Sequence, residues 1–170
     1  LHRLIRRQRQ MCIRDRENTF EVKVSLDGPE YVQNLNRRDY AGNGSFEKIM
    51  KNLPLLRKYE QETGNQISVA SVVTSNNYQY YAESFQFLLD LGIKKLESGI
   101  DYYCSWSDEQ IQGLREQIEK VFGLYKAYIQ KNQEVIFWNL WEQYLKSFLI
   151  PCPFYAVSYT HLRAHETCAD

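Results

Sequence analysis

The chain has 170 residues, an apolar fraction of 44%, and 21 lysine and arginine residues against 21 aspartate and glutamate residues. This length suits one domain or a piece of a larger protein. Without its two ends, residues 1–16 and 157–170, the chain has 14 lysine and arginine residues against 18 aspartate and glutamate residues, and this net charge of about −4 gives no sign of affinity for nucleic acid. No run reaches the roughly 18 apolar residues that a membrane span needs. The cysteines are too few and too scattered for a disulfide scaffold, which predicts a reducing, cytoplasmic location.

Both ends of the chain resemble translated adapters of the kind used to prepare sequencing libraries. Residues 6–16 read RRQRQMCIRDR, and residues 157–167 read VSYTHLRAHET. We therefore expect residues 1–16 and 157–170 to be adapter-derived and non-native, as in a metagenomic fragment. The alternative for the N-terminal arginines is a basic arm that binds nucleic acid or a membrane surface. All three histidines lie in these ends, so the rest of the chain offers no histidine catalysis.

The credible part of the chain begins with a strand and a turn. Apolar and polar side chains alternate over residues 20–26, which is the period of a strand with two different faces. The sequence DGP at 27–29 predicts a tight turn, and a polar segment then leads to a helix that we expect Ser45 to cap. Pro54 within this helix predicts a kink or a split near Asn52.

A second and a third strand follow, with a helix between them. Residues 67–73 are short, apolar and β-branched, which predicts a buried strand parallel to the first. Residues 78–91 predict a helix that stops at Gly92, and residues 93–100 predict a weaker strand. Right-handed crossovers would place the carboxyl ends of all three strands at one edge, where α/β proteins bind their ligands. The expected apolar face of the helix is formed by Tyr81, Phe85, Leu88 and Leu89.

The C-terminal part of the chain is predicted to be helical. Ser107 and Gln110 have the spacing of a capping box at the start of a long helix. A second helix, rich in aromatic residues, is expected over residues 134–149. The expected organisation is therefore an α/β fragment of three β/α units over residues 17–105 and a helical connector over residues 106–156 that leads towards a further domain.

One segment resembles a known family. The run SLDGP at 25–29, Arg37 twelve residues after Ser25, and the G-x-GSF pattern at 42–46 resemble the fourth strand and following loop of radical S-adenosylmethionine enzymes. The resemblance is to the branch with auxiliary iron–sulfur (SPASM) domains, which contains the anaerobic sulfatase-maturating enzymes and peptide maturases. It implies an α/β fold: the C-terminal part of a partial (β/α)6 TIM-like barrel, followed by aromatic-rich helices.

The resemblance also implies a function. Such an enzyme modifies a peptide or protein side chain by hydrogen abstraction with a 5'-deoxyadenosyl radical. Its cofactors would be S-adenosyl-L-methionine and a 4Fe-4S cluster, and its partners a peptide or protein substrate and a reductant such as flavodoxin or ferredoxin, with no nucleic acid and no membrane. The C-x3-C-x2-C loop that holds the cluster is not found in this sequence, so we expect the chain to be inactive by itself. The alternative is a non-catalytic α/β module that binds partners through the aromatic helices between residues 125 and 148.

By resemblance, four residues bind the cofactor. Ser25 matches a cofactor-contacting serine, and Arg37 matches an arginine that pairs with the cofactor's carboxylate. The alternative for Arg37 is a solvated loop residue. Thr74 and Asn76 match a recurring segment that lines the adenosine pocket, although as helix caps they have a sufficient reason to be present.

Other residues carry weaker expectations, and no catalytic residue is assigned. Asp27 is expected to bond the backbone of its own turn rather than to act as an acid or base. Cys152 is either a ligand of an auxiliary cluster or a small buried residue. Gln33 stands where the family usually has a histidine, which leaves the subfamily open.

Overall fold

The computed structural model describes residues 21–149, with side chains described as far as Lys146. The chain divides into a unit that ends at Phe137 and a second unit that begins at Trp138. The elements, in chain order, are β1 (Lys23–Ser25), α2 (Glu30–Asn36), α3 (Phe46–Thr63), β2 (Ser68–Val73), the 3-10 helix η1 (Tyr78–Tyr80), α4 (Tyr81–Asp90), β3 (Lys95–Ile100), α5 (Asp108–Asn132), β4 (Phe137–Trp138) and α6 (Asn139–Leu149).

The strands form a parallel sheet in the order β1-β2-β3-β4. Ser25 of β1 lies opposite Ala70 of β2, and Val73 at the end of β2 lies opposite Ile100 at the end of β3. At the other edge, the backbone N–H of Phe137 donates to the carbonyl oxygen of Lys94 at 2.9 Å. The predicted α/β fold with parallel strands is confirmed.

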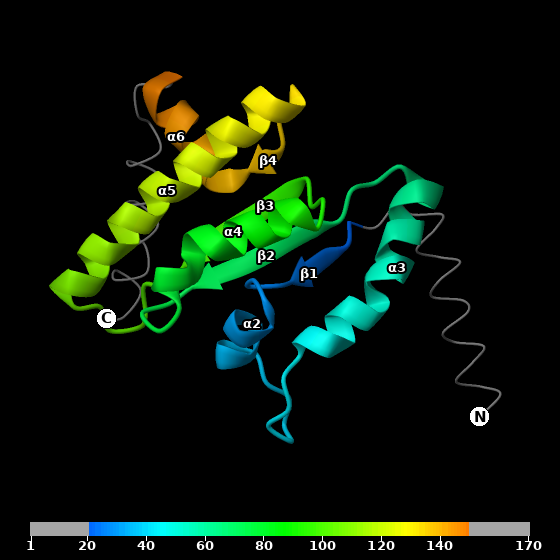
Figure 1. Cartoon of the computed structure of the whole chain (residues 1–170), viewed down its shortest axis with the longest axis horizontal. Helices are drawn as coiled ribbons and strands as arrows, with labels where there is room; N and C mark the ends of the chain where they lie inside the picture. Colours follow the sequence, from blue (N-terminus) through cyan, green and yellow to red (C-terminus); the bar gives the residue numbers. More distant parts are fainter. Residues whose placement is uncertain (1–20, 150–170) are drawn as a thin grey trace, which may run out of the picture. The chain divides into compact units, whose positions relative to one another are not determined.

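The two faces of this sheet differ. On one face α4 lies along β2 and β3, with α5 on one side of α4 and α3 on the other (Figure 1). The strand side chains under this layer are buried, and they include Val69, Ser71, Val73, Leu96 and Ser98. The opposite face, which we call the open face, is exposed or half-buried at Ser25, Ala70, Val72, Glu97 and Gly99, and among the described residues of β1, β2 and β3 on this face only Ser68, at the start of β2, is fully buried. This alternation follows from the two-residue period of a strand.

The helices next to the sheet follow the predicted periodicity. All four residues expected on the apolar face of α4 are buried, namely Tyr81, Phe85, Leu88 and Leu89. Gly92, with φ of 74°, gives the chain the left-handed turn after this helix. The capping box of α5 is confirmed, because Ser107 Oγ accepts from the Gln110 N–H at 3.2 Å and the Ser107 N–H donates to Gln110 Oε1 at 2.9 Å. No helix in the described residues is long and apolar enough to cross a membrane.

Three elements differ from the sequence predictions. The polar segment after the first turn is a helix, α2, which begins directly after Pro29, its N-cap residue. The predicted split near Asn52 is wrong, because α3 runs continuously from Phe46 to Thr63 with Pro54 inside it. The aromatic helix begins at Asn139 rather than at residue 134, because the edge of β3 pairs with Phe137.

The second unit contains helix α6. The rings of Trp141 and Tyr144 stack with their centroids 5.7 Å apart. Glu142 and Lys146 form an ion pair at 3.4 Å, one turn apart on the helix. Such an exposed pair adds only a few tenths of a kcal/mol, roughly 0.3–0.5, to helix stability.

The close packing of the turn after β1 predicts that a side chain at Gly28 destabilises the fold. Gly28 has φ of 153°, and a Cβ atom there would lie 2.2 Å from Ser84 Oγ of α4. We expect Gly28→Ala to lower the free energy of unfolding by about 2–4 kcal/mol, because it adds a steric clash to an unfavourable backbone conformation. Urea unfolding followed by circular dichroism would measure this change.

Gly42→Ala is the matched control. Gly42 also has a positive φ, of 82°, but nothing lies within 4 Å of an added Cβ atom. We expect it to cost about 1 kcal/mol, from the backbone conformation alone. An equal cost at both positions would contradict the role given to the contact with Ser84.

Candidate functional site

The carboxyl ends of β1, β2 and β3 lie at one edge of the sheet, and hydrogen bonds join the loops that follow them. Asn36 Nδ2 donates to Thr74 Oγ1 at 3.2 Å, which connects the loops after β1 and β2. The backbone N–H of Asp101 donates to the carbonyl oxygen of Val73 at 2.9 Å, which connects the ends of β2 and β3. We call this edge, with residues 25–45, 74–77 and 101–106, the strand-end rim.

Asp27 and Arg37 form a two-point ion pair on the rim. Arg37 Nε donates to Asp27 Oδ2 at 2.7 Å, and Arg37 Nη2 donates to Asp27 Oδ1 at 3.0 Å. The Asp27 side chain is 1% exposed and that of Arg37 is 28% exposed. Asp27 Oδ1 also accepts the backbone N–H of Val72 at 2.9 Å. The expectation that Asp27 bonds its own turn is therefore wrong: its carboxylate ties the turn to β2 and to Arg37.

Gln33 holds the other side of the same turn. Its side chain is fully buried, and its Oε1 accepts the backbone N–H of Asp27 at 2.7 Å. Its Nε2 donates to the carbonyl oxygen of Ser25 at 3.2 Å and to Ser45 Oγ at 2.9 Å. One amide thus connects the end of β1, the turn and the start of α3. This structural role of Gln33 depends on contacts with residues that are distant in the sequence.

The start of α3 is therefore capped differently from the prediction. Ser45 precedes the helix as expected, but it makes no side-chain capping bond, because its hydroxyl accepts from Gln33. Asn34 Oδ1 accepts the backbone N–H of Phe46 at 3.2 Å instead. The Asn34 side chain packs against Gly44. A Cβ atom on residue 44 would lie 2.2 Å from it, so only glycine leaves room for this contact.

Ser25 and Arg37 both remain accessible on the rim. Ser25 is exposed on the open face at the end of β1. The guanidinium of Arg37 uses Nε and Nη2 for Asp27, and among the described residues no hydrogen bond involves its Nη1. Because a guanidinium has five N–H donors in a plane, the terminal edge formed by Nη1 and Nη2 can still bind an anion. Arg37 is thus not the freely solvated residue of the alternative interpretation.

Asn77, which the sequence analysis did not single out, fixes the conformation of the loop after β2. Asn77 is 4% exposed, its Oδ1 accepts the backbone N–H of Thr74 at 2.7 Å, and its Nδ2 donates to the carbonyl oxygen of Val72 at 3.0 Å. Thr74 Oγ1 accepts the backbone N–H of the exposed Asn76 at 3.3 Å. These side chains close the loop on itself rather than cap the following helix, where η1 has no side-chain cap.

The loop between α2 and α3 is organised by Asp39. Asp39 Oδ1 accepts the backbone N–H groups of Ala41 at 3.0 Å and Asn43 at 2.9 Å, and Lys48 Nζ donates to Oδ2 at 2.7 Å. The hydrogen bond from Lys48, together with that from the Asn43 backbone, lowers the pKa of Asp39 to about 2. This loop links Arg37 to α3.

The described residues do not fit an iron–sulfur cluster. Within residues 21–149 there is no group of three or more His, Cys, Asp or Glu side chains that could hold a metal ion. Cys104 is half-buried, and its Sγ lies 3.2 Å from the carbonyl oxygen of Asp101. Cys152, the candidate cluster ligand, lies outside the described residues.

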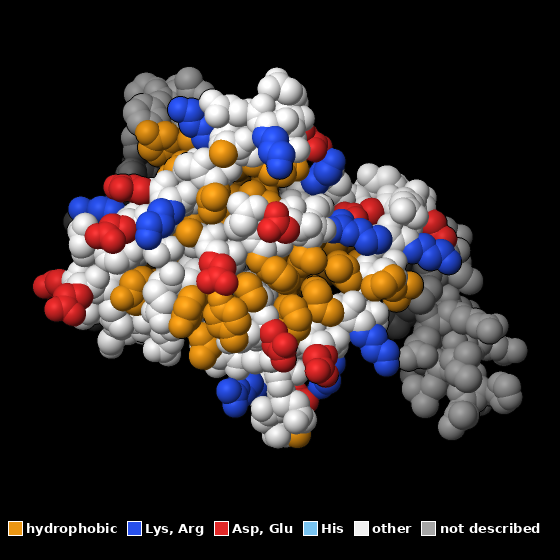
Figure 2. Space-filling model, viewed as in Figure 1, with side chains coloured by type: hydrophobic (Ala, Val, Ile, Leu, Met, Phe, Trp, Pro, Cys, Tyr) orange, Lys and Arg blue, Asp and Glu red, His pale blue; other side chains and the backbone are white. Residues whose placement is uncertain are grey.

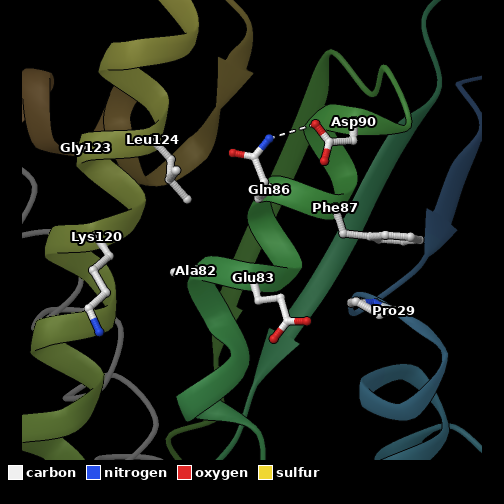
Figure 3. Close-up of a pocket in the computed structure, with 9 residues that line it drawn as sticks. All are labelled: Pro29, Ala82, Glu83, Gln86, Phe87, Asp90, Lys120, Gly123 and Leu124. Carbon is white, nitrogen blue, oxygen red and sulfur yellow. Dashed lines mark hydrogen bonds between the residues drawn. The ribbon is translucent and has the colours of Figure 1, made fainter.

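A shallow groove of about 690 Å³ lies on the helical face, away from the predicted site residues. Figure 2 shows apolar side chains gathered on this face between charged ones. Figure 3 shows the lining residues of the groove on α4, with Lys120, Gly123 and Leu124 of α5 on one side and Pro29 on the other, and with Gln86 bonded to Asp90 at 2.8 Å. None of Ser25, Arg37, Thr74 and Asn76 lines it. The strand-end rim is a better candidate for a ligand site than this groove, because polar groups converge on the rim.

Comparison with curated proteins finds two types of sulfatase-maturating enzyme. The chain is 39% identical over 80 residues to the cysteine-type anaerobic sulfatase-maturating enzyme of Clostridium perfringens, which covers 42% of this chain and 20% of that protein. It is 30% identical over 82 residues to the serine-type enzyme of Bacteroides thetaiotaomicron, which covers 48% of this chain and 19% of that protein. The chain thus spans about a fifth of the length of these relatives. No protein-family model matches it.

Comparison with solved structures finds the same fold. The structure of native anSMEcpe with bound AdoMet matches with a TM-score of 0.64 and 22% identity, over 80% of this chain and 38% of that one. The structure of the same protein with AdoMet and the Kp18Cys peptide matches with a TM-score of 0.63 and 22% identity, over 79% and 38%. The predicted α/β fold is confirmed, and it matches part of the radical S-adenosylmethionine fold of anSMEcpe.

The depressed pKa of Asp39 predicts how the rim responds to acid. Because the folded value of about 2 lies below the ordinary 3.8, the ionised carboxylate stabilises the loop above pH 4, and this contribution is lost as the pH falls toward 2. We expect a carboxyl ¹³C titration of Asp39 to have its midpoint near 2, and Lys48→Met to move it toward 3.8. A midpoint near 3.8 in the unmodified chain would contradict the Lys48 contact.

Proposed function

We propose that this chain, which over part of its length is a distant homologue of the anaerobic sulfatase-maturating enzymes, is part of a radical S-adenosylmethionine enzyme that modifies a peptide or protein side chain in the cytoplasm. Since the chain spans about a fifth of those relatives, we assign the activity to a larger protein and expect the chain alone to be inactive. The observation that carries the proposal is the accessible edge of Arg37, which Asp27 holds on the same rim as the exposed Ser25.

We assign each candidate residue of the rim to one part of such a cofactor. Arg37 would bind the carboxylate through its terminal edge, and the Ser25 hydroxyl would exchange hydrogen bonds with the ribose or the amino-acid group. Thr74 and Asn76 would line the adenosine side, where Asn76 is exposed and Thr74 is held by Asn36. A cofactor held in this way would, on one-electron reduction by the cluster, supply the radical chemistry for hydrogen abstraction from the substrate.

The iron–sulfur clusters are assigned to other parts of the larger protein. The described residues hold no suitable group of ligands, so we place the 4Fe-4S cluster of the cofactor outside them. Cys152 remains our candidate ligand for an auxiliary (SPASM) cluster, since cysteine thiolates are the usual ligands of such clusters.

The proposed partners are a peptide or protein substrate and a reductant such as flavodoxin or ferredoxin, without nucleic acid or membrane. A solved relative with bound AdoMet and the Kp18Cys peptide supports a peptide substrate. The interaction-module alternative gains less support. Tyr125 of α5 is 1% exposed and its hydroxyl donates to the carbonyl oxygen of Ile136 at 2.8 Å, so this aromatic residue is not available for docking.

The first test is the effect of Arg37 on cofactor affinity in the full-length protein encoded at this locus, with its clusters reconstituted. We expect Arg37→Lys to weaken S-adenosylmethionine binding about 10- to 100-fold, because lysine keeps the charge but not the planar fork. Arg37→Lys is preferred to Arg37→Ala, because removal of the charge would leave the Asp27 carboxylate buried without a partner. Equilibrium dialysis would measure the affinity.

Arg38→Ala is the matched control for this test. Arg38 is exposed on the same loop, and its Nε donates to the carbonyl oxygen of Asn34 at 2.9 Å. We expect its loss to change the affinity less than about twofold, since it lies outside the proposed site. Equal affinities of the Arg37→Lys variant and the unmodified protein would remove Arg37 from the site.

A second test concerns the chain by itself. The 170-residue chain should give no detectable heat with S-adenosylmethionine in calorimetry, because the described residues supply only one side of the cofactor site and no cluster ligands. The full-length protein should bind it after cluster reconstitution. Micromolar binding by the isolated chain would contradict the proposed need for the larger protein.

A further inference from the structure

We propose that Asp27 is a positioning residue that orients Arg37 toward the carboxylate of a bound small molecule, and that its link to Val72 fixes this orientation relative to β2. The inference rests on the proposed function of the rim and adds a residue that acts through Arg37. It starts from the burial of the Asp27 carboxylate, which is 1% exposed, beside a guanidinium that is 28% exposed.

Both oxygens of the carboxylate hold Arg37 along one edge. Oδ2 accepts from Nε at 2.7 Å and Oδ1 accepts from Nη2 at 3.0 Å. A two-point contact fixes the plane of the guanidinium as well as its distance, which a single contact does not do. The opposite edge, with Nη1, is then directed away from Asp27.

The carboxylate itself is held from the neighbouring strand. Val72 donates its backbone N–H to Oδ1 at 2.9 Å, and the backbone N–H of Asp27 donates to Gln33 Oε1 at 2.7 Å. The carbonyl oxygen of Gln33 in turn accepts the backbone N–H of Arg37 at 3.0 Å. These bonds form a closed ring through Asp27, Gln33 and Arg37, so the guanidinium cannot rotate without breaking its part-buried hydrogen bonds to Asp27.

A second carboxylate in the same molecule provides a comparison. Glu60 accepts from Arg57 Nη1 at 2.6 Å through Oε2, and accepts the backbone N–H of Ile67 at 2.9 Å through Oε1, before β2 begins. Arg57 Nη2 also donates to the carbonyl oxygen of Leu91. Both terminal nitrogens of Arg57 are therefore used within the protein, whereas Nη1 of Arg37 makes no hydrogen bond within the described residues. The Arg57–Glu60 pair, at the start of β2, therefore has no terminal nitrogen left for a ligand. The Arg37–Asp27 pair, at the end of β1, still has one.

The test is a double-mutant cycle in the reconstituted full-length protein, with S-adenosylmethionine affinity as the readout. Asp27→Asn keeps an acceptor for the Val72 N–H but loses the charge and one acceptor for Arg37. We expect it to weaken binding about tenfold, and to change it less than about twofold in an Arg37→Lys background, because Asp27 acts only through the arginine fork. A residue that only stabilises the fold would give effects that add in the cycle.

Glu60→Gln is the matched control, since it alters an arginine–carboxylate pair that also accepts a strand N–H. We expect it to lower the urea midpoint of unfolding and to leave the affinity within about twofold. If Arg37→Lys weakens binding while Asp27→Asn does not, or if the two effects add, the positioning role is wrong and the proposed site stands. If neither variant changes the affinity, the proposed site itself is wrong.

Discussion

A carboxylate that is almost fully buried must be compensated by charge and by hydrogen bonds, and two partners of the Asp27 carboxylate meet this requirement while a third fixes its backbone. Arg37 supplies the charge, Val72 supplies a backbone N–H of the next strand, and Gln33 holds the backbone of Asp27 itself. Loss of any one of these partners would leave a polar group buried without compensation. The geometry of the strand-end rim therefore depends on one ion pair.

The hydrogen bond between the Asp27 carboxylate and β2 also explains how a strand as short as β1 is held in the sheet. β1 has three residues, and its backbone pairing with β2 ends near Leu26, whose N–H donates to Ala70 at 3.0 Å. The Asp27 carboxylate then takes the next N–H of β2, so the ladder continues through a side chain. Gly28 turns the chain at that point, against Ser84 of α4. The turn is thus fixed to the sheet on one side and to the helical layer on the other.

Much of the fold could be predicted because its signals are local. β2 and α4 follow from short-range periodicity, and the start of α5 follows from two residues three positions apart. The details of the rim could not, since they depend on pairs far apart in the sequence. Asp27 and Val72 are 45 positions apart, and Gln33 and Ser45 are 12 apart. β4 was not predicted for the same reason. Its extended backbone is determined by pairing with the edge of β3 and not by the sequence around Phe137.

The candidate site residues also divide into those with a local sequence signal and those without one. Ser25 and Arg37 were identified by the resemblance of their spacing to a known pattern, and the structure places both on one rim with Gln33 bonded to the backbone of each. Asn77 and Gln33 were missed because a buried amide has no sequence signature that separates it from an exposed one. Their bonds to the backbone of Thr74, Val72 and Asp27 are what give the loops one conformation. A site of this kind is recognised from a few side chains that could contact a ligand, but its shape is determined by the buried amides and the carboxylate behind them, because these fix the backbone from which the contacting side chains project.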